Sequence, residues 1–159
     1  MTEELLIASA IHSWKQNVER ATKAFSGLTD RQLQIEVAPG RNRLLYLWGH
    51  LTAVHDAMLP LLGLGNRLHP ELDAAFVRAA DKAVDGLPTP SVLRDCWDEV
   101  NGELLKAFEK FTASDWAGKH TAVSEEDFAK NPIRNRLSVL LSRTNHLSYH
   151  VGQAALAPK

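Results

Sequence analysis

Cysteine is almost absent from this chain of 159 residues, which contains only Cys96. A single cysteine excludes an internal disulfide and any zinc site built from several thiolates, and it is typical of a reducing compartment. Basic residues are missing from the first positions, Met1-Thr2-Glu3-Glu4, where a secretory signal would carry them. We therefore expect a cytoplasmic protein.

An excess of positive charge and a long uncharged apolar run are also lacking. The 18 Lys and Arg face 19 Asp and Glu, for a net charge of −1, whereas nucleic-acid binding needs a surplus of cations. The most apolar stretch, residues 44–64, is interrupted by His50, His55 and Asp56. Charge at the centre of a membrane-spanning helix is costly, so this stretch predicts a core helix. We expect neither nucleic-acid nor membrane partners.

Helical periodicity is what the chain does contain. Apolar residues recur at spacings of three and four in four long stretches, about residues 3–26, 42–60, 90–111 and 133–155. Pro60 should kink or end the second helix, because proline lacks the amide donor. A chain of this length with four amphipathic helices, no strand pattern and no repeat predicts an all-α four-helix bundle forming one domain over residues 1–159.

The connections and the core faces complete this expectation. A short helix is expected over residues 72–83, and residues 112–132 read as a long connection across the bundle, with Trp116 covering it. The fourth helix should place five apolar side chains on its core side, namely Leu137, Leu140, Leu141, Leu147 and Val151. On the second helix, His55 is expected as a packing or surface residue and Asp56 as a solvated one.

Two histidines offer the clearest chemical signal. His146 and His150 are four residues apart, so on a helix they share one face and a single metal ion can bridge them. A zinc peptidase would need Glu directly after the first histidine, and Leu147 stands there. His50 falls about 60° from Leu47 on an ideal helix, close enough to the core side to be a third ligand. From spacing alone, half-exposed surface histidines explain this pattern as well.

Two segments resemble the motifs of a known family. Leu47-Trp48-Gly49-His50-Leu51 is similar to the first histidine motif of the DinB-like (DinB/YfiT) metal-binding proteins. The segment His146-Leu147-Ser148-Tyr149-His150-Val151-Gly152-Gln153 resembles their second motif, and Pro39-Gly40-Arg41-Asn42 stands where their pattern has it. Asn145 departs from the residues that often precede the second motif. The resemblance spans essentially the whole chain.

This resemblance implies a fold, a metal and an activity. It implies an up-down-down-up four-helix bundle, frequently a homodimer, with a divalent metal, usually zinc or nickel, on His50, His146 and His150. Characterised relatives are thiol-dependent, including S-transferases that use bacillithiol or mycothiol. A metal ion with three neutral imidazole ligands has an open coordination position, and a thiol bound there loses its proton to become a thiolate. With no second cysteine in the chain, an external low-molecular-weight thiol is the simpler cofactor.

Two functions therefore remain in view. The first is a metal-dependent S-transferase that joins a low-molecular-weight thiol to a small-molecule electrophile. The second is a non-catalytic helical dimerisation or ligand-binding module with structural histidines. A metal ion bound with an exchangeable coordination position would favour the S-transferase, and the absence of metal binding would favour the module.

Overall fold

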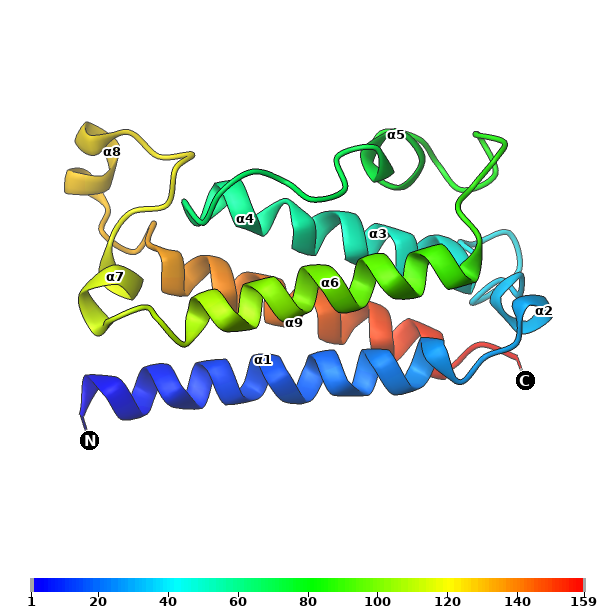
Figure 1. Cartoon of the computed structure of the whole chain (residues 1–159), viewed down its shortest axis with the longest axis horizontal. Coiled ribbons are helices and arrows are strands. Elements are labelled where there is room, and N and C mark those ends of the chain that lie inside the picture. Colours follow the sequence, from blue (N-terminus) through cyan, green and yellow to red (C-terminus); the bar gives the residue numbers. More distant parts are fainter. Residues whose placement is uncertain (1, 159) are drawn as a thin grey trace.

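The computed structural model describes residues 2–158, and that part of the chain is helical without any strand (Figure 1). Two isolated bridges, Glu36 to Arg43 and Lys119 to Asn135, are its only β pairings within those residues. The four longest helices are α1 (Glu3–Ser26), α3 (Leu44–Asp56), α6 (Pro90–Phe108) and α9 (Arg136–Ala155). No helix within residues 2–158 is both long and apolar enough to span a membrane.

Local capping explains where three of these helices begin. The side chain of Thr2 accepts a hydrogen bond from the Leu5 amide at the start of α1. Thr89 and Asn135 cap α6 and α9 in the same way, and Pro90 occupies the first turn of α6, where no amide donor is needed. The beginnings of all three helices therefore follow from the local sequence.

The second predicted helix is divided in two. It ends as α3 at Asp56, and after Ala57 the short α4 (Met58–Leu61) continues it. Pro60 has no amide to donate to the carbonyl of Asp56, so the hydrogen-bond series is interrupted one turn before the proline. The break that Pro60 was expected to cause therefore occurs at Ala57, one turn before the proline.

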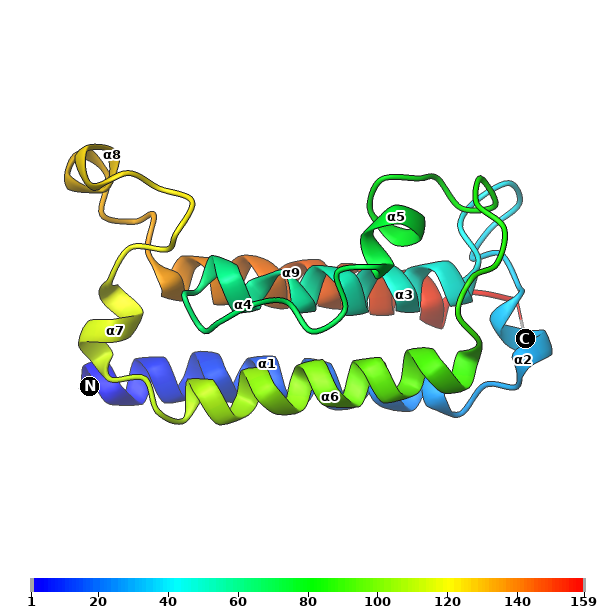
Figure 2. The ribbon, with the colours of Figure 1, turned by 45° about the horizontal axis from the view of Figure 1, so that its top comes forward.

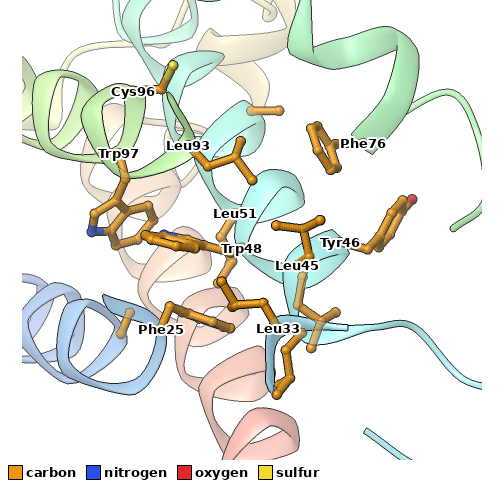
Figure 3. Packing of buried hydrophobic residues seen from close by; sticks show 14 of the residues in the cluster. Phe25, Leu33, Leu45, Tyr46, Trp48, Leu51, Phe76, Leu93, Cys96 and Trp97 are labelled. Carbon is orange, nitrogen blue, oxygen red and sulfur yellow. The ribbon is translucent and has the colours of Figure 1, made fainter. Parts of the chain in front are cut away.

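The four long helices pack around one another. Helix α1 contacts α9, α3 contacts α6, and α3 also contacts α9. Almost every residue of α3 is buried, so it forms the centre of the core. Its Trp48 ring stacks on Phe25 of α1 at 5.8 Å between ring centroids, and Figure 3 shows Trp97 of α6 in the same cluster.

Short helices occupy the connections. They are α2 (Asp30–Leu33), α5 (Leu72–Phe76), α7 (Ala113–Ala117) and α8 (Glu125–Lys130). Helix α5 is shorter than the predicted 72–83, and the connection predicted over 112–132 contains two helices (Figure 2). Trp116 of α7 is fully buried against Phe108 and Phe111, which confirms that it covers this end of the core.

One predicted core residue is wrong. Leu141 of α9 is 46% exposed, whereas Leu140 and Leu147 are fully buried. Neighbouring residues on a helix point about 100° apart, so Leu140 and Leu141 cannot both face the same narrow stripe.

Candidate metal centre

Helices α3 and α9 bring three histidine rings together. His50 comes from α3, and His146 and His150 lie one turn apart on α9. The Nε2 atom of His146 is 3.2 Å from that of His50 and 3.1 Å from that of His150. All three rings are half-buried. The structure therefore assembles the three residues that the spacing and the resemblance predict as ligands.

The outward-facing nitrogens define which ring atoms carry protons. Nδ1 of His50 lies 2.8 Å from the backbone carbonyl of Phe76, and Nδ1 of His150 lies 2.7 Å from Oε1 of Gln153. A carbonyl oxygen only accepts, so each Nδ1 must donate a proton. In the neutral rings the Nε2 atoms of His50 and His150 then present lone pairs toward the centre of the cluster.

This arrangement fits a divalent metal ion. Nitrogens bound to one tetrahedral zinc at its usual bond length are about 3.3 Å apart, close to the separations found here. Acceptors on the outer nitrogens are also what metal-bound histidines characteristically have, since they fix the tautomer and the ring orientation. Without an ion, the lone pairs of His50 and His150 share a single proton donor, the His146 ring.

Burial and the charges of neighbouring groups favour the neutral forms of His146 and His150 near pH 7. Burial, and after it the charges of His150, His50 and Arg143, together lower the pKa of His146 to about 4. Burial also lowers the pKa of His150. Neutral imidazole is the form that binds metal, so protons do not compete for His146 or His150 near pH 7.

His146 differs from its two neighbours because its outer nitrogen lacks an acceptor. Nδ1 of His146 is buried and has no hydrogen-bond partner among the described residues. The preceding Asn145, where the chain departs from the family pattern, is exposed and makes no hydrogen bond to the ring within residues 2–158. Two of the three histidines, His50 and His150, therefore have a hydrogen-bond acceptor on the nitrogen that faces away from the cluster.

The acceptor for His50 depends on a close approach of two helices. A Cβ atom at Gly49 would lie 2.3 Å from the Phe76 ring, so only glycine lets α5 pack this closely against α3. Sequence reasoning missed Phe76, because a backbone carbonyl leaves no side-chain signal. A glycine within a buried apolar helix was the available clue.

A buried carboxylate holds α5 in place, and it corrects the expectation that Asp56 is solvated. Asp56 is fully buried and accepts hydrogen bonds from Arg67 Nε and from the backbone amides of Leu68 and His69. Arg67 also pairs with Asp73 of α5. These bonds satisfy the carboxylate inside the protein and tie the segment before α5 to α3.

His55 lies on the same helix as His50 but outside the cluster. It is fully buried, with Nδ1 2.8 Å from Oδ1 of Asn101 and with the rings of Trp14 and Trp97 at 4.6 and 5.0 Å. Burial lowers the pKa of His55 to about 3. His55 is therefore a neutral packing residue, one of the two roles expected for it.

The remaining candidates also lie away from the cluster. His12 is exposed, and His69 contacts the carboxylates of Glu71 and Glu99. Cys96 is buried on α6, and burial raises the pKa of its thiol, so it stays protonated and unreactive near pH 7.

A comparison with known families places the cluster in context. A model of the DinB superfamily matches residues 13–154, a range that contains all three clustered histidines. No curated protein matches the chain. The match and the three-histidine cluster together fit a metal-binding protein of this superfamily.

Proposed function

The chain belongs to the DinB superfamily, and we propose that it is a thiol-dependent S-transferase whose divalent metal, zinc or nickel, is held by His50, His146 and His150. One observation carries the proposal. The Nε2 atom of His146 lies 3.1–3.2 Å from those of His50 and His150, while two of the opposite nitrogens donate to fixed oxygen acceptors.

The chemistry needs an activated thiol and a dry, oriented site. A divalent ion with three imidazole ligands and an open position supplies the means of keeping a thiol ionised at neutral pH. The chain supplies the rest: the Phe76 carbonyl and Gln153 hold two rings in their ligating tautomer, and half-burial limits competition from water. Because Cys96 is buried on α6, the thiol is an external one of the bacillithiol or mycothiol type.

The transfer itself is a displacement. The thiol loses its proton to solvent, and its sulfur forms a bond to an electrophilic carbon of the small-molecule substrate. The bond from that carbon to its leaving group breaks, and the leaving group keeps the electron pair.

We also propose the finer architecture that the resemblance implies. The up-down-down-up order is supported by the colour gradients in Figure 1, where α1 and α9 run one way and α3 and α6 the other. A homodimer is supported by two exposed residues near the end of α9, Tyr149 and Leu156. The lone buried Cys96 is consistent with a cytoplasmic protein that forms one domain over residues 1–159.

One observation favours the rival function, a non-catalytic dimerisation or ligand-binding module. If His146 carries its proton on Nε2, it can donate to His50 or His150 at the distances observed. With the proton on Nε2, the buried Nδ1 of His146 carries no hydrogen, so no buried donor is left without an acceptor there. In this reading the cluster is a structural hydrogen-bond network.

Metal content separates the two functions. Elemental mass spectrometry on untagged protein should find about one zinc or nickel per chain, lost in His50→Ala and His146→Ala and retained in the exposed control His12→Ala. Circular dichroism would verify that the variants stay helical. Protein that is metal-free as purified and takes up neither added ion would overturn the proposal.

Activity follows as a second measurement. The metal-loaded protein should conjugate bacillithiol to the electrophile monochlorobimane faster than the His146→Ala variant does. Metal binding with no rate above that variant, for bacillithiol and mycothiol alike, would contradict the transferase and favour the ligand-binding module.

A further inference from the structure

A second candidate site lies beside the first turns of α9, before the clustered histidines. An open pocket of about 280 Å³ is lined there by the end of α4, the connection after α7 and the first turns of α9. Its polar lining includes two guanidinium groups, an imidazole and two hydroxyl groups, from Arg134, Arg143, His120, Ser138 and Ser142. No carboxylate is among the described residues that line it. We call this the basic pocket.

Arg143 is the cation least compensated by the protein. Its side chain is half-buried, its Nε atom is buried without a hydrogen-bond partner, and it forms no ion pair within residues 2–158. Burial alone lowers the pKa of this guanidinium. Removing a cation from water without a partner costs free energy, and a bound anion would recover it.

The other side chains add to the positive potential. Arg134 reaches only the exposed Asp127, at 3.9 Å. Nδ1 of His120 accepts from the Ala122 amide, so the neutral ring carries its proton on Nε2 and can donate. Burial and then the charges of Arg134 and Lys119 lower the pKa of His120. The lining therefore offers several donors and a positive charge that no pocket residue neutralises.

The basic pocket and the histidine cluster share one face of α9. Val139, Arg143, His146 and His150 follow one another at spacings of three and four residues. At 1.5 Å per residue, Arg143 is about 4.5 Å from His146 along the helix axis. The charge of Arg143 also acts on His146 and lowers its pKa. The basic pocket and the histidine cluster are therefore neighbours along α9.

We propose that the basic pocket binds the carboxylate of one of the two reactants, and that Arg143 is its principal partner. This inference rests on the proposed transferase function for the identity of those reactants. The carboxylate belongs either to the thiol or to the electrophile, and in both cases it directs the reactive atom toward His146. Leu61, Ile133 and Val139 line the same pocket and would contact the apolar part of that molecule.

The first arm of the test asks whether the thiol carries the carboxylate. Cobalt-loaded protein is titrated with mercaptohexanoate and with mercaptohexanol, which match in length, and binding is followed by the sulfur-to-cobalt charge-transfer band. We expect the carboxylate thiol to bind about tenfold more tightly, because a hydrogen bond to a charged group is worth more than a neutral one. Arg143→Gln should abolish the difference, and Arg20→Gln, on the exposed face of α1, should retain it.

The second arm needs no metal. Calorimetry measures glutarate binding to the metal-free protein and to its Arg143→Gln and Arg20→Gln variants. Glutarate binding that depends on Arg143, with no preference in the thiol arm, assigns the carboxylate to the electrophile. Equal thiol affinities together with no Arg143-dependent glutarate binding would overturn the inference. A failure of cobalt or of every thiol to bind would instead contradict the proposed function, and the glutarate arm would still decide the pocket.

Discussion

His50 and His55 lie five residues apart on α3, yet their burial and the groups that face their Nε2 atoms differ. His55 is fully buried between Trp14 and Trp97. His50 is half-buried and faces His146 and His150. Both rings have a partner at Nδ1, a side-chain amide for His55 and a backbone carbonyl for His50. The difference lies at Nε2.

The comparison shows that a histidine becomes a candidate ligand through what its second nitrogen faces. Nε2 of His55 is buried and unpartnered among aromatic rings, where no further ligand can join it. Nε2 of His50 faces the imidazole of His146, and the half-buried His150 ring completes the group. One helix thus supplies a packing histidine and a candidate ligand.

Acid should destabilise the protein, and His55 should make the largest single contribution. Its pKa rises from about 3 in the folded state to 6.5 when unfolded, so protons bind the unfolded chain preferentially as the pH falls. Between these two pH values, His55 alone should lower the free energy of unfolding by roughly 4–5 kcal/mol, and in metal-free protein His146 adds to that loss in the same direction. Denaturant titrations at several pH values measure this slope. His55→Gln should flatten it, and an unchanged slope in that variant would break the comparison.

Truncating His55 should cost stability but not metal. His55→Ala leaves a cavity between two tryptophans and an unpaired Asn101 amide oxygen, which together should lower the free energy of unfolding by about 3 kcal/mol. Elemental analysis of the folded variant should still find one metal per chain. Loss of metal from folded His55→Ala protein would mean that the two histidines act as one unit.

Enlarging Gly49 should affect the His50 side. The added Cβ collides with the Phe76 ring, and moving α5 withdraws the carbonyl that accepts from His50. We expect Gly49→Ala to lower stability by about 2 kcal/mol and zinc affinity roughly tenfold, measured against a chromophoric chelator. Gly102→Ala on α6 is the matched control, because a Cβ atom there has no neighbour within 4 Å. It should lower neither the stability nor the zinc affinity.

The smallest effect is expected at Gln153. Gln153→Leu removes the acceptor of His150 and should weaken zinc binding roughly tenfold without changing stability by more than about 0.5 kcal/mol. Gln153→Glu keeps an oxygen acceptor and should preserve the affinity. Equal affinities in Gln153→Leu and the unmodified protein would show that orientation of His150 does not depend on this side chain.

Much of this arrangement was predictable from the sequence. The spacing of His146 and His150 placed both rings on one face, and the position of His50 beside Leu47 placed it near the interior. The starts of α1 and α6 agree with the predicted ranges, whereas α9 begins at Arg136, after its capping residue Asn135, and not near 133. These features depend on residues only a few positions apart.

The rest depends on contacts that periodicity does not encode. The burial of Asp56 requires Arg67 and two backbone amides from a segment with no repeating pattern. The Phe76 carbonyl is available because α5 ends at that residue rather than further along. The pocket around Arg143 could not be predicted from the sequence, since a pocket that involves the end of α4 leaves no pattern in α9 alone.

The separation of the ligands along the chain has a consequence for biosynthesis. One of the three histidines has local support, because Asp56 and Arg67 tie α5 to α3 and the Phe76 acceptor is 26 residues from His50. The other two lie on the last helix, where His146 is 96 residues from His50. During synthesis the N-terminal part can fold first, but His146 and His150 join only after α9 has emerged from the ribosome. Under the proposed function, metal loading is therefore one of the last events in maturation, and a chain that stops before α9 presents only one of the three proposed ligands.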